Sequence, residues 1–285
     1  MYYFGFDIGA SSIKAVLVKD KAVIDSKFQD SPDSLEKLGE ALVRLKNELI
    51  GEKSIGEISG IGVGVAGILD KERQAVIKSP NIPYLDNQPL KKILEEHFKP
   101  LPVKIEHDVH CFLMAEKETG QAKDFKNIFY LTLGSGIGGA WMFEGKIVYG
   151  DHGSAGEAGH MIIDVCQGLK FEELAANKFI MKSLGVGSLE AEQRILKGND
   201  EAHKVMRQLG TNLGIGIANI INILDPEAVV LSGGISWAES LIMPKMKEAI
   251  NKYVVSPAAK ETKVFFSGIG RYGGALGATL LFENK

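Results

Sequence analysis

The fold is decided by the stretch Phe6-Asp7-Ile8-Gly9-Ala10-Ser11-Ser12-Ile13-Lys14-Ala15-Val16-Leu17. Apolar runs at Tyr2–Phe6 and Ile13–Val18 predict two strands, and the small residues between them predict a turn. Such a turn presents backbone N–H groups and hydroxyls to phosphate oxygens. Asp7 stands at its mouth, where a carboxylate can hold Mg²⁺ directly or through water. The stretch therefore indicates a nucleotide site whose phosphate contacts are Gly9, Ala10, Ser11 and Ser12.

Lys14 stands in the second of these strands. A phosphate contact is conceivable for a lysine so close to the turn. In an alternating strand, however, such a side chain more often lies on the solvated face. We therefore expect the Lys14 side chain to be exposed.

The same pattern returns at Leu131-Thr132-Leu133-Gly134-Ser135-Gly136-Ile137-Gly138-Gly139-Ala140-Trp141-Met142. The equivalent positions are Asp7 and Thr132, Gly9 and Gly134, and Ala15 and Ala140. A third strand is predicted after each copy, at Ala22–Phe28 and at Lys146–Tyr149. An internal repeat sets the architecture. It predicts two similar lobes that each offer one phosphate-binding turn to a shared central cleft, the second through Gly134, Ser135 and Gly136.

The composition is that of an ordinary globular protein, with 285 residues, 45% hydrophobic and 24% charged. A net charge of -3 gives no general attraction to nucleic acid or to an anionic membrane, so neither is an expected partner. No apolar stretch reaches the roughly 18 residues that a membrane span needs. The N-terminus shows no secretory signal pattern, and two cysteines make no disulfide framework. We expect a cytoplasmic protein.

Periodicity along the rest of the chain predicts alternating helices and strands, and thus an α/β fold with mixed sheets. The further predicted strands are Ile58–Val65, Val103–Ile105, Ala228–Leu231 and Lys263–Phe266. The predicted helices are Ser34–Glu48, Leu90–Phe98, Val109–Thr119, Phe171–Leu184, Leu189–Leu196, Ala202–Leu224, Ser240–Tyr253 and Gly274–Phe282. We assign residues 1–112 with 273–285 to an N-terminal lobe and residues 113–272 to a C-terminal lobe.

Two glycine motifs, at residues 62–67 and 134–139, fit the spacing GxGxxG. A dinucleotide site of the Rossmann type needs a helix after the glycine turn, and neither motif is followed by one in this sequence. A third cluster, Leu231-Ser232-Gly233-Gly234-Ile235, follows an apolar strand. Ligands bind at that edge of open α/β sheets, so Gly233 and Gly234 are interpreted as the adenosine side of the nucleotide site.

Together these motifs resemble the ROK family of repressors and sugar kinases, within the actin-like sugar kinase and Hsp70 superfamily. Further matching segments are Ser79-Pro80-Asn81-Ile82-Pro83, Glu106-His107-Asp108, Gly156-Glu157-Ala158-Gly159-His160 and Gly273-Gly274-Ala275-Leu276-Gly277-Ala278. The resemblance covers nearly the whole chain. It implies two duplicated actin-like (ribonuclease H-like) lobes. It also implies phosphorylation of a hexose or hexosamine hydroxyl with ATP and Mg²⁺, and a homodimer is the expected assembly.

The resemblance assigns the general base to Asp108, which accepts the proton of the attacking hydroxyl. An Asp before a helix also commonly acts as an N-cap, and both roles can hold. The implied sugar-binding residues are Gly67, Asn81, His107, Asp108, Glu157, His160 and Glu172. On pattern alone Glu172 belongs to a solvated first helical turn and Asn81 to a proline-flanked turn.

The sequence departs from the family pattern in three places. His107 stands where these kinases usually carry Asn. Of the usual zinc ligands only His160 and Cys166 are present, so we expect no zinc and interpret Cys166 as a small core residue. The family's repressors carry an N-terminal winged helix-turn-helix, whereas this sequence begins at the first phosphate motif.

The leading hypothesis is a glucokinase-like enzyme, and an N-acetylhexosamine kinase acting on GlcNAc or ManNAc is the close alternative. A non-catalytic sugar sensor belongs to a different class, which the residues Asp7, Asp108 and Gly134–Gly139 argue against. An Hsp70-like ATPase would need a peptide-binding domain, for which no residues remain. The acceptor sugar and the choice between ATP and polyphosphate as donor stay open.

Overall fold

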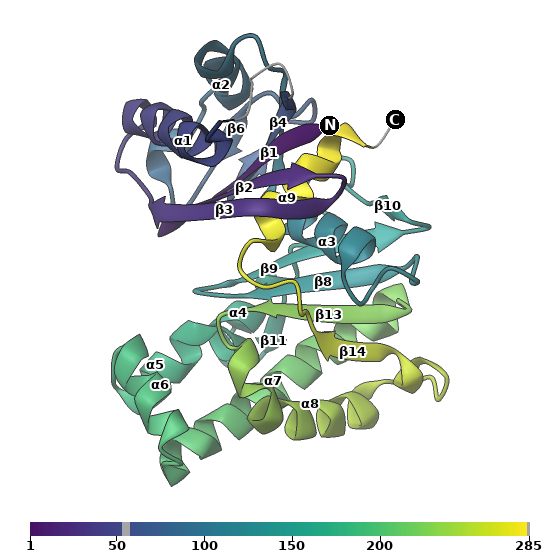
Figure 1. The fold of residues 1–285 in the computed structure, drawn as a ribbon. Helices are drawn as coiled ribbons and strands as arrows, with labels where there is room; N and C mark the ends of the chain where they lie inside the picture. The colour runs from purple at the N-terminus through teal and green to yellow at the C-terminus, as the bar shows by residue number, and fades with distance from the viewer. Residues whose placement is uncertain (53–57, 284–285) are drawn as a thin grey trace. The chain divides into compact units, whose positions relative to one another are not determined.

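The computed structural model describes residues 1–52 and 58–283 (Figure 1). The chain packs as two compact units. Unit 1 consists of Met1–Asp124, Tyr149–Ala155 and Gly268–Lys285, and unit 2 consists of Phe125–Val148 and Gly156–Ser267. The lobe boundaries drawn from the sequence, 1–112 with 273–285 and 113–272, remain a prediction about how the chain divides.

Unit 1 is built on a five-stranded sheet of order β3-β2-β1-β4-β7. Its strands are β1 (Tyr2–Ile8), β2 (Ser12–Lys19), β3 (Ala22–Asp30), β4 (Ile58–Val65) and β7 (Val103–His107). The first three strands are antiparallel, whereas β1, β4 and β7 run parallel. The carboxyl ends of β1, β4 and β7 therefore meet at one edge of the sheet, the edge where α/β proteins place their ligands.

Helices cover both faces of this sheet (Figure 1). They are α1 (Leu35–Ile50), α2 (Leu90–Phe98), α3 (Asp108–Thr119) and α9 (Gly273–Thr279). On β1 the residues Phe4, Phe6 and Ile8 pack with α1 and α2, because successive side chains point to opposite faces. Asp7 therefore points to the other face, where Val16 and Val18 pack with α3 and α9.

The glycine motif at residues 62–67 allows close helix packing. A Cβ on Gly62 would lie 1.9 Å from the carbonyl oxygen of Ala278 in α9. The segment after β4 is the short strand β5 (Ile68–Leu69), which pairs with β6 (Val76–Lys78), and not a helix.

Unit 2 repeats the arrangement with a sheet of order β10-β9-β8-β13-β14. Its strands are β8 (Ile128–Leu133), β9 (Ile137–Phe143), β10 (Lys146–Ile147), β13 (Ala228–Gly233) and β14 (Lys263–Phe266). The helices that complete its core are α4 (Phe171–Ala175), α5 (Asn177–Leu184), α6 (Ser188–Leu196), α7 (Asp200–Leu224) and α8 (Glu239–Tyr253). Because the two sheets share one strand order, the predicted duplicated α/β fold with mixed sheets is confirmed.

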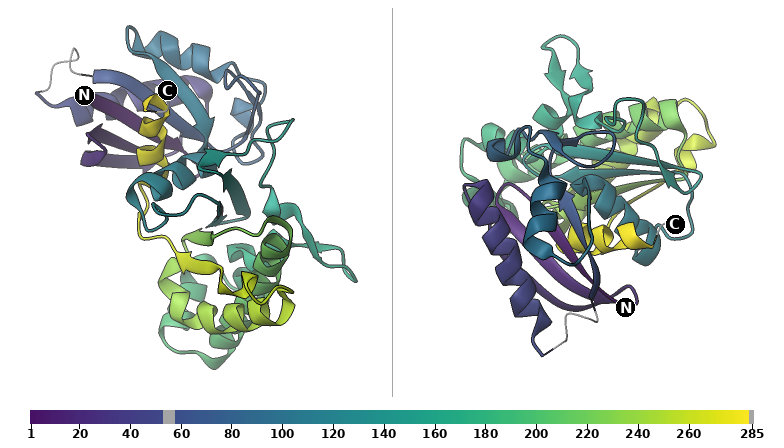
Figure 2. Two further views of the ribbon diagram at one scale, coloured as in Figure 1. Left: turned by 90° about the vertical axis from the view of Figure 1, so that its right-hand side faces the viewer. Right: turned by 90° about the horizontal axis from the view of Figure 1, so that it is seen from above.

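A small hairpin, β11 (Ile162–Asp164) with β12 (Leu169–Lys170), extends from unit 2 (teal-green in Figure 2). Val165 near its tip is 87% exposed. Cys166 beside it is exposed too, so the prediction that Cys166 is a core residue is wrong. The hairpin presents this side chain to solvent because no apolar surface covers its tip among the described residues.

Two further sequence predictions need correction. The helix predicted over Phe171–Leu184 breaks at Ala176, because the Asn177 N–H leaves the helical pattern and donates to the Gly134 carbonyl at 3.0 Å. The turn of the second repeat is also one residue shorter than that of the first. Ala15 pairs with Phe6, and Gly139, not Ala140, takes the equivalent place opposite Leu131.

Within the described residues, no helix is both long and apolar enough to cross a membrane.

Candidate nucleotide and sugar site

Asp7 and Lys14 form an ion pair beside the first phosphate turn. They lie directly opposite each other in the antiparallel β1–β2 pair, so both side chains point to the same face of the sheet. Lys14 Nζ lies 3.0 Å from Asp7 Oδ2, and the Lys14 side chain is only 22% exposed. The prediction that Lys14 lies on a solvated face is therefore wrong. The pairing depends on strand register, which the spacing of residues alone did not reveal.

The carboxyl group of Asp7 is buried and lies within electrostatic reach of Asp108. Burial raises the pKa of Asp7 from 3.8 to about 6; the charge of Lys14 opposes this rise and the charge of Asp108 adds to it. Strand β4 lies between the strands that carry the two carboxylates. Gly64 of β4 pairs with Asp7 on one side and, on the other, with Glu106, which precedes Asp108 by two residues. The structure thus brings Asp7 and Asp108 to the same sheet edge.

Asp108 is the first residue of α3, and its predecessor His107 is the N-cap. The Asp108 side chain is 24% exposed, and its Oδ1 accepts a hydrogen bond from the Val109 N–H at 2.9 Å. Its other oxygen accepts none from residues 1–52 or 58–283, so a substrate hydroxyl can reach it. His107 Nδ1 lies 3.6 Å from Asp108 Oδ1. The side-chain cap proposed as an alternative for Asp108 thus reaches only the adjacent N–H.

The first turn leaves its hydroxyl groups available. The Gly9 N–H donates to the Ser12 carbonyl at 3.1 Å, which closes the turn. The Ser31 hydroxyl donates to the Gly9 carbonyl at 2.5 Å and holds the turn from outside. The side chains of Ser11 and Ser12 make no hydrogen bond within the described part of the chain, and Ala10 and Ser11 are exposed. The predicted phosphate contacts are therefore accessible.

Gly67 and the turn that contains Asn81 lie together in unit 1. The Ser79 hydroxyl donates to the Ala66 carbonyl at 2.6 Å. Gly67 has a φ of 149°, and a Cβ there would lie 2.8 Å from the Lys78 carbonyl, so this position requires glycine. Asn81 itself is exposed. These contacts hold the backbone around Gly67 against the segment that leads to Asn81. The sugar-binding role of Gly67, Asn81 and His107 stays a prediction.

In unit 2 the second turn and the Gly233-Gly234 cluster end adjacent strands. The Gly134 N–H donates to the Gly136 carbonyl at 3.0 Å, and the Gly234 N–H donates to the Leu133 carbonyl at 3.1 Å. A Cβ on Gly134 would meet no atom of the described residues within 4 Å apart from its chain neighbours, so the turn has open space beside it. Sequence analysis missed Asn177 here, because its place beside Gly134 depends on the break in the helix. Its Oδ1 is buried and lacks a hydrogen-bond partner within the described residues.

Two predicted sugar residues of unit 2, Glu157 and Glu172, lie near the imidazole of a third, His160. His160 Nε2 lies 3.9 Å from Glu157 Oε2, and His160 Nδ1 lies 3.9 Å from Glu172 Oε1. Lys170 Nζ, which sequence analysis missed, lies 3.4 Å from His160 Nδ1. Carboxylates and an imidazole in this arrangement can hold neighbouring hydroxyl groups. The Glu172 carboxylate also lies above the second turn, where a Cβ on Gly136 would be 2.5 Å from its Oε2.

The donor set fits a magnesium nucleotide in which the protein supplies few metal ligands. The described residues contain no group of three or more His, Cys, Asp or Glu side chains that could hold a metal ion. Mg²⁺ usually keeps several waters and is held by one or two carboxylates together with substrate phosphates. The buried Asp7 carboxylate beside an open turn matches that requirement.

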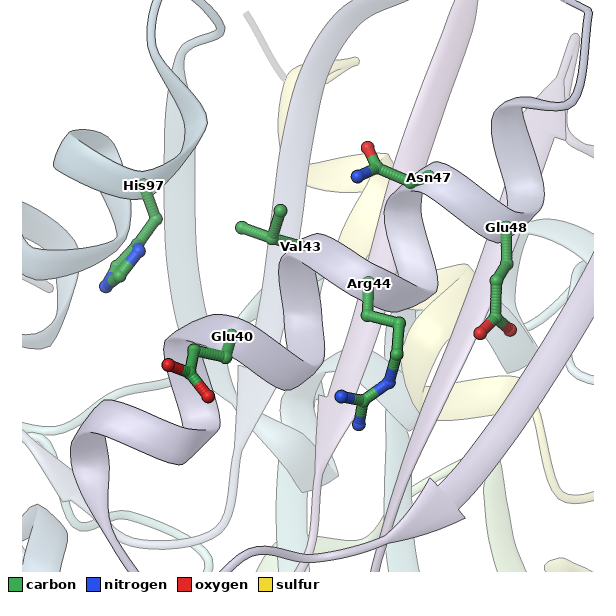
Figure 3. Close-up of a pocket in the computed structure, with 6 residues that line it drawn as sticks. All are labelled: Glu40, Val43, Arg44, Asn47, Glu48 and His97. Atoms are coloured by element: carbon green, nitrogen blue, oxygen red, sulfur yellow. The ribbon is translucent and has the colours of Figure 1, made fainter.

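A surface depression between α1 and α2 in unit 1 contains none of the predicted site residues (Figure 3). It is lined by Glu40, Val43, Arg44, Asn47, Glu48 and His97. The charges on its walls are of mixed sign, so it favours no ligand class.

The sequence matches known proteins along nearly its whole length. A model of the ROK family matches residues 3–285. An uncharacterised protein of Clostridium perfringens is 32% identical over 98% of this chain and 97% of its own. N-acetyl-D-glucosamine kinase of Vibrio parahaemolyticus is 29% identical over 98% and 99%. The xylose repressor of Caldicellulosiruptor bescii is 30% identical over 87% of this chain and 69% of its own.

Solved structures share the fold. A ROK family glucokinase from Streptomyces griseus, determined in complex with glucose and AMPPNP, has a TM-score of 0.86 at 22% identity over 99% of both chains. A ROK hexokinase from Thermus thermophilus has a TM-score of 0.82 at 28% identity and covers 98% of this chain and 97% of its own. The expected actin-like fold is confirmed by this likeness.

Proposed function

Because the chain belongs to the ROK family, we propose that it is an ATP-dependent, glucokinase-like enzyme that phosphorylates a hydroxyl group of a hexose. One observation carries the proposal: the accessible Asp108 carboxylate lies at the same sheet edge as the Asp7–Lys14 pair and the first turn. Phosphoryl transfer needs donors on the phosphates and a group that accepts the proton of the attacking hydroxyl. Unit 1 contains residues of both kinds.

Asp108 is the general base in this mechanism. Its Oδ2, which has no hydrogen-bond partner among the described residues, accepts the proton of the sugar hydroxyl. The hydroxyl oxygen attacks the terminal phosphorus of ATP, and the bond from that phosphorus to the bridging oxygen breaks and releases ADP. The Gly9–Ser12 turn donates N–H and O–H groups to phosphate oxygens, and Lys14 adds a positive charge beside them. Mg²⁺, held by Asp7 directly or through water, would neutralise phosphate charge.

Unit 2 supplies the remaining contacts. Gly134, Ser135 and Gly136 bind phosphate, and Gly233 and Gly234 bind the adenosine part of the nucleotide. Glu157, His160 and Glu172 bind sugar hydroxyls, as Gly67, Asn81 and His107 do from unit 1. The close approach of His160 to both carboxylates supports this grouping.

A second candidate is an N-acetylhexosamine kinase. The Vibrio parahaemolyticus relative bears the name of such an enzyme at 29% identity, whereas the Thermus thermophilus hexokinase at 28% identity favours a hexose. Among the predicted sugar-binding residues, His107 is the one that departs from the family pattern, which has Asn at this position. Both a hexose and an N-acetylhexosamine therefore stay possible as the acceptor. A non-catalytic regulator, the class of the xylose repressor, has no need of the accessible Asp108 carboxylate.

A panel of hexoses and N-acetylhexosamines tests the proposal through sugar-dependent ADP release, with ATP and polyphosphate compared as donors. We expect one hexose to give the highest kcat/KM with MgATP. Preference for GlcNAc or ManNAc would select the second candidate. Sugar binding by calorimetry without turnover of any member would contradict the enzyme and favour a sensor.

A further inference from the structure

A buried polar cluster lies directly behind the proposed base, within unit 1. Its centre is Glu106, which is only 3% exposed and immediately precedes the N-cap of α3. Glu106 Oε1 accepts the His107 N–H at 2.7 Å and lies 2.9 Å from His110 Nδ1. Glu106 Oε2 accepts the Tyr149 hydroxyl at 3.0 Å and lies 3.5 Å from Arg73 Nε. The carboxylate therefore has two partners on each oxygen.

The partners on Oε1 lie on either side of Asp108 in the sequence. His107 precedes Asp108 and His110 is in the same helical turn, so one carboxylate oxygen binds the chain before and after the base. The direction of the Asp108 side chain depends on this turn, because α3 begins at Asp108 itself. Rotation of the turn would have to break two hydrogen bonds to a buried charge, which is costly.

The partners on Oε2 fix the carboxylate from the other side. The guanidinium carbon of Arg73 lies 4.0 Å from the centre of the Tyr149 ring, and the His110 ring meets the same ring edge-on at 5.1 Å. Burial alone would raise the pKa of Glu106. The His110 hydrogen bond and charge, the His107 N–H and Arg73 together lower it below its usual range. Glu106 is therefore ionised at neutral pH.

We propose that Glu106 is a positioning residue that fixes the first turn of α3 and thereby aims the Asp108 carboxylate, with Tyr149 and Arg73 holding Glu106 in place. The inference rests on the proposed function, because it assigns Glu106 a task in the chemistry of Asp108. It is a role for a residue that does not touch substrate. Glu106 belongs to the matching segment Glu106-His107-Asp108, in which the resemblance assigns roles only to His107 and Asp108. A merely structural Glu106 would affect stability and leave the reaction rate per folded molecule unchanged.

The test compares Glu106→Gln with a matched control, Glu116→Gln. Glu116 is also fully buried and lies near the opposite end of α3, where its Oε1 accepts the Gln121 N–H at 2.7 Å. Glutamine keeps the shape of each side chain but places an NH₂ group against donors. We expect Glu106→Gln to lower kcat by about 10–100-fold, the cost of a displaced reacting group, while the KM for ATP changes by less than about threefold. Glu116→Gln should lower the melting temperature and leave kcat per folded molecule within about twofold of wild type.

Tyr149→Phe gives a second, milder test that removes only one hydroxyl. It should lower kcat by about two- to fivefold with little change in the KM for ATP. Hydrogen exchange provides a readout without turnover: the His107 amide should exchange faster in Glu106→Gln than in Glu116→Gln.

Each outcome decides the inference. If wild type turns over no sugar, both the proposed function and the positioning role fail. If wild type is active and Glu106→Gln retains its kcat, the kinase stands and the positioning role is overturned. Equal losses of kcat in Glu106→Gln and Glu116→Gln would also overturn it. If Glu106→Gln does not fold, an unchanged kcat in Tyr149→Phe overturns the role and the expected loss supports it.

Discussion

The two phosphate turns occupy the same place in two sheets of the same strand order, yet they differ in charge. In unit 1 the turn connects β1 to β2, and the last pairs before it join Asp7 to Lys14 and Ile8 to Ile13. In unit 2 the turn connects β8 to β9, and the corresponding pairs join Thr132 to Gly138 and Leu133 to Ile137. A buried ion pair in one unit is thus replaced in the other by a hydroxyl opposite a glycine.

This difference indicates a division of labour within a duplicated fold. In the proposed mechanism the unit 1 copy supplies the charges for phosphoryl transfer, because Asp7 and Asp108 lie at one sheet edge. The unit 2 copy leaves room beside its backbone, since Gly134 has open surroundings and its turn is one residue shorter. The two copies share a strand order, and they differ in the length of the turn and in the side chains of the strand pair that precedes it.

The largest expected effect tests whether the general base of the reaction lies in unit 1. Asp108→Asn should lower kcat by about 10²–10⁴, the usual contribution of a general base, because the amide cannot accept the hydroxyl proton. The affinities for sugar and ATP should change little. Steady-state kinetics with the preferred sugar measure both.

Glu172→Gln in unit 2 is the matched variant. As a proposed sugar contact it should act mainly on the KM for sugar, by about tenfold. If Asp108→Asn keeps a near-normal kcat while Glu172→Gln loses it, the division between the units is the reverse of the one proposed.

The second prediction concerns the free energy of unfolding that is lost because the charge of Asp7 is buried. Because burial raises the pKa of Asp7 from 3.8 to about 6, the folded protein binds this proton more tightly than the unfolded chain does. The contribution of Asp7 to the free energy of unfolding is therefore most favourable below about pH 4, and it is lost as the pH rises through about 6. A shift of this size corresponds to at most about 3 kcal/mol.

Asp7→Asn should accordingly raise the free energy of unfolding of the metal-free protein at about pH 7.5 and change it much less at about pH 4. Loss of the Lys14 ion pair will reduce the gain. Urea unfolding at both pH values measures it, and Thr132→Val at the equivalent position of unit 2 should show no such pH dependence. A greater loss of stability in Asp7→Asn at the higher pH would mean that the ion pair outweighs the cost of burial.

The third prediction concerns His107, the sugar-side residue of unit 1 that replaces Asn. An imidazole and an amide can both donate and accept, but their polar atoms are spaced differently. Loss of a hydrogen bond to a buried hydroxyl costs about 1–3 kcal/mol, enough to reorder similar hexoses. His107→Asn should therefore change the ranking of glucose against other hexoses and hexosamines.

His97→Asn, in the depression of α1 and α2, is the control for removing an imidazole from unit 1 (Figure 3). It should leave the substrate ranking unchanged. An unchanged ranking in both variants would show that the His107 side chain does not select the sugar.

Local patterns in the sequence were sufficient for most of the fold. Strands Ile58–Val65 and Lys263–Phe266 and helix Leu90–Phe98 have the predicted bounds, because hydrophobic periodicity and breaking residues determine such elements locally. The sequence did not reveal contacts that depend on register or on distant packing. The break at Ala176 is accompanied by the hydrogen bond from the Asn177 N–H to the Gly134 carbonyl, and Gly134 lies more than 40 residues earlier in the chain.

The same limit applies to the candidate site. Asp7, Asp108 and the glycines were found because they belong to contiguous motifs. Lys14 was assigned to solvent because its partner lies across a turn, and the partners of Glu106 come from three separate segments. Family motifs locate residues that touch ligands more readily than the residues that hold those in place.

The smallest expected effect tests the claim that the unit 2 turn contributes space. Gly134→Ala adds a methyl group that would meet none of the described residues within 4 Å apart from its chain neighbours, so the folded protein should accommodate it at little cost. If a nucleotide phosphate approaches the backbone there, the same methyl group will obstruct it. We expect the KM for ATP to rise by about five- to tenfold, roughly 1 kcal/mol, with kcat and the KM for sugar nearly unchanged.

Gly187→Ala is the control, since Gly187 also has open surroundings and lies outside the glycine motifs. An ATP KM that stays at the wild-type value in Gly134→Ala would mean that the second turn does not approach the nucleotide closely, and the likeness between the two turns would then be one of backbone alone.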